Sequence, residues 1–154
     1  MGADITVLNA HTSGGEAVAD LLVRYTPDLK GCVIEGDIIP TLIDEIPVIA
    51  VLAAFADGTT TIRNAEELKV KESNRLEIIV HHLSEMGCDI TGTEDGMIIR
   101  GGKPLHGAVL DSHLDHRIAM SFAVAGLIAD GETEITNADC VNISYPGFYR
   151  DLLR

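Results

Sequence analysis

The sequence has 154 residues, enough chain for one domain with its own core. Hydrophobic residues make up 46% but aromatic residues only 4%, with no Trp, so aliphatic side chains must fill that core. A net charge of −13 argues against nucleic acid or an anionic membrane surface as a partner. The longest apolar run, 46–56, is too short to span a bilayer, and no secretory leader pattern is found, so we expect a cytoplasmic protein.

The first part of the chain reads as strands followed by a helix. The predicted strands are 4–8, 18–24, 31–35 and 59–63, with the turn-prone residues 11–15 between the first two. A helix is predicted over 44–56. Asp44 is its expected N-cap, Pro47 falls in its first turn, where no backbone donor is needed, and Gly58 follows its end.

The remainder repeats this rhythm. A helix is predicted over 73–86, because apolar residues recur there at i, i+3, i+4 and i+7 and Gly87 follows. Another helix is predicted over 115–129, and a short final one after Pro146. The strands predicted in this part are 89–91, 97–100, 108–111 and 132–136.

Four short blocks of sequence occur twice in the same order. The matching blocks are 1–5 with 86–90, 29–33 with 105–109, 56–58 with 129–131, and 64–66 with 137–139. The offset shrinks from 85 to 76 to 73 residues, as loop deletions would produce. The sequence therefore predicts an α/β (α+β) fold of about two β-α-β-α-β-β units, approximately 1–85 and 86–154, with helices packed on sheets.

Cysteines and histidines give no sign of a metal site. Cys32, Cys88 and Cys140 are far apart and odd in number, which favours buried thiols in a reducing compartment. His81 and His82 are adjacent, so on a helix their side chains point about 100° apart. We therefore expect no metal ligands among them.

The few basic residues are concentrated, and one cluster lies just before a helix. Lys71 and Glu72 precede Ser73, a credible N-cap, so they belong to the loop. Arg75 falls in the first helical turn, where the helix dipole disfavours a cation. A bound anion beside that turn would explain it, while a merely solvated helix start is the competing interpretation.

Two further helix starts carry candidate residues. The segment Asp115-His116-Arg117 again puts a cation in a first turn, and the same argument applies. Asp44 and Arg117 lie the same number of residues before the two copies of the Ala-Asp-Gly block, so they occupy equivalent positions in the two units. Asp44 itself is either an ordinary N-cap or an acid that faces this base, and the residues alone leave both interpretations open.

These motifs resemble those of the EPSP synthase family. Its members carry an acid near the start of an apolar helix, then K-E-x-x-R, then D-H-R, and the chain has all three in that order, at Asp44, Lys71–Arg75 and Asp115–Arg117. The segments Gly58-Thr59-Thr60 and 144–148 are also similar to the family. One position departs: a substrate-contacting lysine of some members corresponds here to Ile143. The resemblance covers essentially the whole chain.

The resemblance implies transfer of the enolpyruvyl group of phosphoenolpyruvate to the 5-hydroxyl of shikimate 3-phosphate, without a metal or organic cofactor. It implies Asp44 and Glu72 as the acid/base pair, with either able to take either part, and Lys71 as a relay or a phosphate contact. Arg75 and Arg117 would grip anionic oxygens, and His116 is a further candidate phosphate donor.

The resemblance also implies that residues 1–154 form part of a C-terminal domain. The family has two similar domains of three such units each, with the site between them. The N-terminal domain of the same enzyme would then be the main protein partner. Two alternatives stay open: the sister enzyme that uses UDP-N-acetylglucosamine, and a non-catalytic repeat module that binds a phosphorylated ligand.

Overall fold

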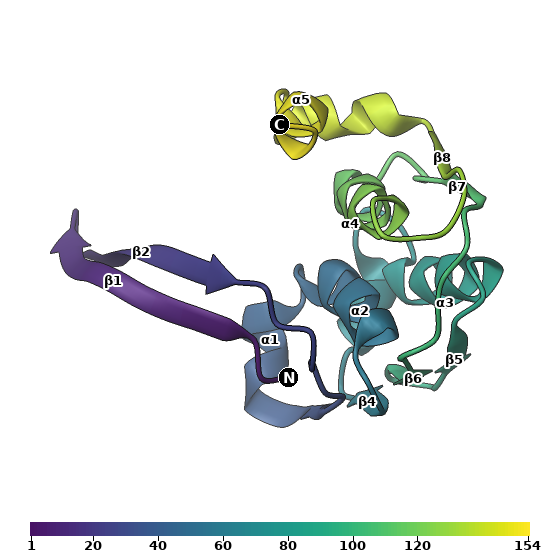
Figure 1. Ribbon diagram of the computed structural model, residues 1–154, viewed down its shortest axis with the longest axis horizontal. Helices are drawn as coiled ribbons and strands as arrows, with labels where there is room; N and C mark the ends of the chain where they lie inside the picture. The colour runs from purple at the N-terminus through teal and green to yellow at the C-terminus, as the bar shows by residue number, and fades with distance from the viewer.

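The computed structural model describes the whole chain, from Met1 to Arg154 (Figure 1). Its strands are β1 (Asp4–Ser13), β2 (Glu16–Arg24), β3 (Val33–Ile34), β4 (Thr59–Ile62), β5 (Asp89–Gly92), β6 (Met97–Arg100), β7 (Val109–Asp111) and β8 (Glu134–Thr136). Its α-helices are α1 (Ile39–Leu42), α2 (Ile46–Phe55), α3 (Arg75–Glu85), α4 (His116–Gly126) and α5 (Phe148–Leu152). Three 3-10 helices, η1 (Gly36–Ile38), η2 (Glu66–Val70) and η3 (Ala138–Ile143), complete it.

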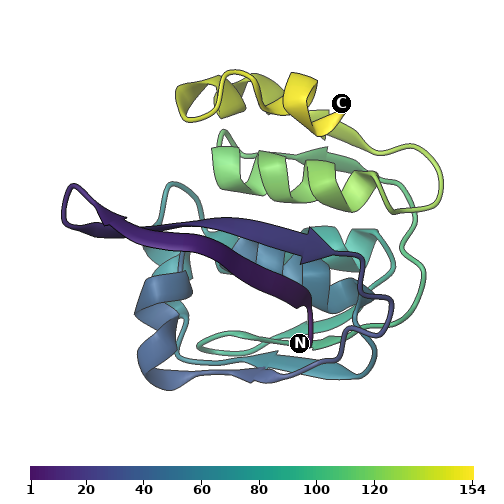
Figure 2. The same ribbon diagram turned by 60° about the vertical axis from the view of Figure 1, so that its left-hand side comes forward.

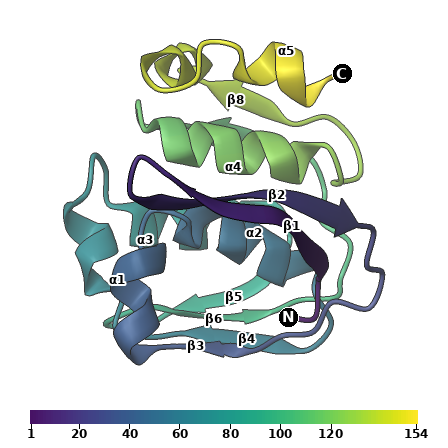
Figure 3. The same ribbon diagram turned by 90° about the vertical axis from the view of Figure 1, so that its left-hand side faces the viewer.

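The strands form one four-stranded sheet and two pairs. The larger sheet has the order β3-β4-β6-β5, in which β3 and β4 are parallel and the other neighbours antiparallel. β7 pairs with β8 in parallel, and β1 with β2 as an antiparallel hairpin. Figure 3 shows the larger sheet along one side, α2 and α3 over it, then α4, and α5 farthest away. Every helix and strand expected from the sequence is present, which confirms the mixed α/β fold.

Helix α2 lies at the centre of this arrangement because it has no polar face. Six of its ten residues are buried, including Ile46, Ala50 and Ala54, as expected for a helix that is apolar all round, while Val48 and Leu52 stay exposed. The sheet lies under it and α4 packs against it.

No single helix of the chain is long and apolar enough to cross a membrane. Two helical segments, 36–42 and 46–55, meet the length and composition test only when they are taken together, and they are bent by 110° relative to each other.

Positions that the predicted repeat pairs have matching backbone conformations. Gly58 and Gly131 share a φ of +92°, and Asn64 and Asn137 adopt left-handed φ values of 57° and 56°. The first block matches too. The carbonyl of Met1 accepts a hydrogen bond from the amide of Lys30, and the carbonyl of Met86 accepts one from His106, both at 3.0 Å.

A close backbone contact recurs in both units and requires glycine. Gly31 lies against the backbone of Thr59, and Gly107 lies in the same way against Glu132. A Cβ added at either glycine would collide with backbone atoms, which cannot swing aside. The two glycines thus hold equivalent crossing points between parallel segments, at the isolated bridges 30 with 57 and 106 with 130.

The hairpin β1–β2 is longer than the sequence suggested and stands apart from the rest (Figures 1 and 2). β1 continues through residues 11–13, which the sequence assigned to the turn, and the reversal is made by Gly14 and Gly15 alone. Positive φ at two successive residues matches the right-handed twist of the strands and makes this tight turn possible. Every residue of both strands is exposed.

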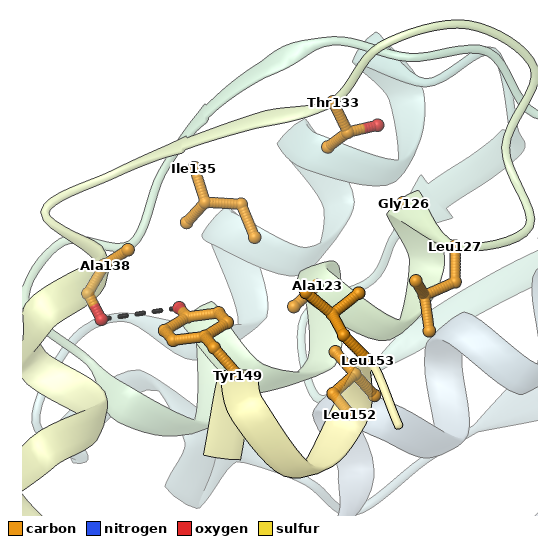
Figure 4. A pocket seen from close by; sticks show the side chains of 9 residues that line it. All are labelled: Ala123, Gly126, Leu127, Thr133, Ile135, Ala138, Tyr149, Leu152 and Leu153. Carbon is orange, nitrogen blue, oxygen red and sulfur yellow. Dashed lines mark hydrogen bonds between the residues drawn. The ribbon is translucent and has the colours of Figure 1, made fainter. Parts of the chain in front are cut away.

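An apolar pocket of about 320 Å³ lies where α5 packs over α4 (Figure 4). Tyr149 closes one side, and its hydroxyl donates a hydrogen bond of 3.3 Å to the carbonyl of Ala138. The lining residues are Ala123, Gly126, Leu127, Thr133, Ile135, Ala138, Tyr149, Leu152 and Leu153. None of them carries a charge, so this pocket is not where an anion would bind.

Candidate active site

Asp44 lies just before α2 and does not cap it. The residue at the cap position is Glu45, and it makes no side-chain cap hydrogen bond, so the expected capping role of Asp44 is wrong. Its Oδ1 instead accepts a hydrogen bond of 2.9 Å from Nη1 of Arg75 and lies 3.5 Å from Nζ of Lys71. The side chain remains 42% exposed, so a second oxygen is open to a ligand.

Arg75 is the centre of the cluster. It is the first residue of α3, and its side chain is only 1% exposed. Nε donates to Oδ2 of Asp115 at 2.8 Å, Nη1 donates to Asp44, and Nη2 donates to Oε2 of Glu72. A buried guanidinium is tolerated only when such carboxylates surround it. Burial lowers its pKa, but Asp115, Glu72 and Asp44 outweigh that and raise it.

Asp115 is a fully buried carboxylate that joins two helix starts. Its Oδ1 caps α4, accepting from the amides of Arg117 at 2.9 Å and Ile118 at 3.4 Å. Its Oδ2 accepts from Arg75 and, at 2.9 Å, from Oγ of Ser73. Burial raises its pKa, but the hydrogen bonds from Arg75 and Ser73 and the Arg75 charge hold it below the usual range.

Ser73 and Asp115 were not singled out from the sequence as site residues. Ser73 was the expected N-cap of α3, but the N-cap is Asn74, whose side chain accepts a hydrogen bond from the amide of Glu77. The one available signal was that Asp115 stands at a cap position beside a cation in D-H-R. The partner across the fold, Arg75, is visible only in three dimensions.

Lys71 and Arg117 complete the cluster and keep part of their surface exposed. Nη1 of Arg117 donates to the carbonyl of Asp44 at 2.9 Å and to Oε1 of Glu45 at 3.1 Å. Lys71 lies 2.6 Å from Oε1 of Glu67, and this partner raises its pKa. The side chain of Arg117 is 34% exposed and that of Lys71 is 21% exposed, so both retain donors for an incoming anion.

Five of the six sequence-predicted site residues therefore meet at one place. Asp44, Lys71, Glu72, Arg75 and Arg117 are linked by direct contacts, with Arg117 bonded to the backbone of Asp44. His116 is half-buried at the start of α4 and makes no hydrogen bond to any of the five. The geometry thus joins the acids and cations directly, and His116 is not part of this network of contacts.

The electrostatics of the cluster favour an ionised Asp44. Burial raises the pKa of Asp44, but the charges of Lys71, Arg117 and Arg75 lower it by more. The side chain of Glu72 is 54% exposed and forms an ion pair with Arg75 alone. The carboxylates around the cluster outnumber the cations, so this cluster alone would bind anions weakly. It offers two positioned carboxyl groups beside partly free Lys71 and Arg117.

The comparisons with known proteins agree with these motifs. The family model described as EPSP synthase (3-phosphoshikimate 1-carboxyvinyltransferase) matches residues 1–152. The chain is 59% identical over 150 residues to the 3-phosphoshikimate 1-carboxyvinyltransferase of Thermoanaerobacter sp. (strain X514), covering 97% of this chain and 35% of that protein. It is 58% identical over 154 residues to that of Synechococcus sp. (strain JA-3-3Ab), covering all of this chain and 34% of that protein.

Solved structures give the same result for the fold. The EPSP synthase of Acinetobacter baumannii superposes with a TM-score of 0.93 at 43% identity, over 97% of this chain and 35% of that one. The enolpyruvyl transferase NikO of Streptomyces tendae superposes with a TM-score of 0.64 at 22% identity, over 98% of this chain and 32% of that one, which supports the shared fold alone. The chain thus spans about a third of the length of the relatives that it matches. On the family model, the identities and the three motifs together, the chain belongs to the EPSP synthase family.

Proposed function

We propose that the chain is one wall of an active site that transfers the enolpyruvyl group of phosphoenolpyruvate to the 5-hydroxyl of shikimate 3-phosphate. The observation that carries the proposal is the junction of Asp44, Arg75 and Glu72, in which one buried guanidinium holds two partly exposed carboxyl groups. Paired carboxyl groups of this kind suit a reaction in which one proton is removed and another is delivered. The names of the relatives support the same chemistry.

The proposed reaction is addition followed by elimination. The 5-hydroxyl oxygen attacks C2 of phosphoenolpyruvate and loses its proton, while C3 gains a proton, to give a tetrahedral intermediate. C3 then loses a proton, the C2–C3 double bond re-forms, and the bond from C2 to the phosphate oxygen breaks, releasing phosphate. The ionised Asp44 is suited to orient or deprotonate the hydroxyl, and the exposed oxygen of Glu72 to serve C3.

The proposed anion contacts divide according to exposure. Arg117 and Lys71 each keep surface that a phosphate or carboxylate can reach. Arg75 is enclosed, so it contacts a substrate only if Glu72 swings off Nη2. Because Glu72 is more than half exposed, that movement needs no repacking of the core. We place His116 at the rim of the site as a secondary phosphate donor.

We further propose that the chain is part of a C-terminal domain that packs against a further repeat unit and, across the site, against an N-terminal domain. In the second unit, β6 pairs with β5 on one edge and β4 on the other. In the first unit, the equivalent strand β2 pairs with β1 only, so its other edge is unpaired. Between the hairpin and α2 lies an apolar groove of about 580 Å³, lined mostly by hydrophobic residues such as Val23, Val48 and Phe55. An unpaired strand edge beside exposed apolar surface is a natural docking place.

The test is a measurement of phosphate release from phosphoenolpyruvate with the two acceptor classes. We expect the longer polypeptide that contains this chain to use shikimate 3-phosphate and not UDP-N-acetylglucosamine. We expect the 154-residue chain alone to be folded and inactive, because holding two substrates in register is worth roughly 7–11 kcal/mol and one wall cannot supply it. Phosphate release with UDP-N-acetylglucosamine, or none with either acceptor, would refute the proposed reaction.

A further inference from the structure

A second cluster of side chains lies at the opposite end of α3 from Arg75. His81 and His82 occupy its C-terminal half, and Glu85 is its last residue. One ligand atom from each of the three, two imidazole nitrogens and a carboxylate oxygen, lies within 4.8 Å of the others. About seven residues at 1.5 Å of rise separate His82 from Arg75, or roughly 10 Å, so this cluster is distinct from the candidate active site.

His82 is the unusual member, because it is buried and only half satisfied. It is 2% exposed and packs edge-on against Phe122, with ring centroids 5.0 Å apart. Its Nε2 lies 2.7 Å from the carbonyl of Asp111. A carbonyl can only accept, so Nε2 carries the proton and Nδ1 presents a lone pair. That buried Nδ1 has no hydrogen-bond partner, a costly arrangement in a native protein.

The unpartnered Nδ1 lies near a carboxylate oxygen. Nδ1 of His82 lies 3.8 Å from Oε2 of Glu85, too far for a hydrogen bond. Two electron-rich atoms that face each other across such a gap are stabilised by a cation between them. Two ligands bonded at about 2.0–2.1 Å to one tetrahedral ion lie roughly 3.3 Å apart, so a small shift of the half-exposed Glu85 would close the site.

His81 supplies the third ligand. Its Nε2 lies 3.6 Å from Oε1 of Glu85, one helical turn away on the same face. The rings of His81 and His82 have centroids only 5.6 Å apart. The two side chains do diverge as expected, since His82 is buried and His81 is exposed, yet Glu85 lies within reach of both. His81 is 64% exposed and free to adjust.

We propose that His81, His82 and Glu85 bind one divalent transition-metal ion of the zinc type. Two imidazole nitrogens and one carboxylate are ligands that Zn²⁺ accepts, and the Asp111 carbonyl that fixes the His82 tautomer is the outer partner such ligands commonly have. The ring of His113 stacks on that of His82, with centroids 6.1 Å apart, and helps to hold the ligand in place. All three ligands lie on α3, so the ion would stabilise the end of that helix, and it has no part in the proposed enolpyruvyl transfer.

The experiment is a chelator-buffered Zn²⁺ titration of the 154-residue chain, with folding followed by circular dichroism and Co²⁺ absorption as a second readout. We expect one ion per chain, a rise in thermal midpoint on binding, and at least a tenfold loss of affinity in His81→Ala and in Glu85→Gln. Both positions are exposed, so these variants should fold; His82→Gln should abolish binding and is checked by circular dichroism.

The controls are His11→Ala, a histidine exposed on β1, and Cys32→Ser, a partly buried thiol that could itself bind zinc. Both should keep the affinity of the unaltered chain. Absence of one-to-one binding in the folded chain would overturn the proposal. So would an affinity that survives both His81→Ala and Glu85→Gln, or one that falls instead in Cys32→Ser.

Discussion

Two aspartates next to helix starts are held by the same arginine and differ in what they can do. Asp115 is fully buried, with both oxygens occupied by Arg75, Ser73 and the first amides of α4. Asp44 is 42% exposed, and only one of its oxygens is engaged. The buried acid can hold the fold together but cannot reach a substrate, whereas the exposed acid can act on one. Exposure therefore suits Asp115 to a structural role and leaves Asp44 as the acid that is proposed to act on the substrate.

The sharpest way to break this comparison is to remove each acid in turn. Asp115→Ala should lower the free energy of unfolding by about 3–5 kcal/mol, because it leaves the Arg75 charge buried without its main partner and α4 without a cap. Asp44→Ala should lower it by less than about 1 kcal/mol, because its ion pairs are partly solvated. Urea denaturation of both variants measures the difference. Equal losses would mean that burial does not separate the two roles.

The next prediction compares the two repeat units. Gly31→Ala and Gly107→Ala should each cost about 1–3 kcal/mol of stability, because the new methyl group meets backbone in both units. Gly92→Ala is the control, since its Cβ would make only ordinary contacts with Val80. Thermal denaturation compares the three. A large loss at Gly31 with none at Gly107 would show that the two crossing points are not equivalent.

A smaller effect should appear in the pH dependence of stability. The pKa of Asp115 is depressed in the folded state, mainly because the hydrogen bonds from Arg75 and Ser73 overcome burial. Its contribution is therefore complete above the unfolded value of about 3.9 and is lost as pH falls from there through the folded pKa. Urea midpoints between about pH 6 and about pH 2.5 should fall less steeply in Asp115→Asn. A slope identical to that of the unaltered chain would contradict the assignment.

Much of the fold followed from the sequence because it depends on local patterns. The helices α2 and α3 were indicated by an apolar run and by an apolar period, respectively. The repeated Ala-Asp-Gly block indicated two positions with the same backbone conformation. The extension of β1 was missed because residues 11–13 are turn-prone locally, while the cross-strand ladder after an irregularity near Asn9 keeps them extended. The short α1 carries too few residues to show a period.

The candidate site was predictable in its cations and less so in its acids. A cation in a first helical turn is anomalous on its own, and this singled out Arg75 and Arg117. The role of Asp44 was not decided, because an acid before a helix is usually a cap and only its contact with Arg75, 31 residues away, shows otherwise. Asp115 was missed for the same reason, since its partner lies 40 residues away.

The most direct test of the proposed active site is the rate of phosphate release by Glu72→Gln in the longer polypeptide, with shikimate 3-phosphate and phosphoenolpyruvate. The matched control is Glu77→Gln, since Glu77 is an exposed acid without an ion pair in the first turn of α3, the helix that follows Glu72. We expect kcat to fall by roughly 10²–10⁴-fold in Glu72→Gln, since a positioned acid/base group is removed, and to stay unchanged in Glu77→Gln. An undiminished kcat in a folded Glu72→Gln variant would show that this cluster does not carry the chemistry.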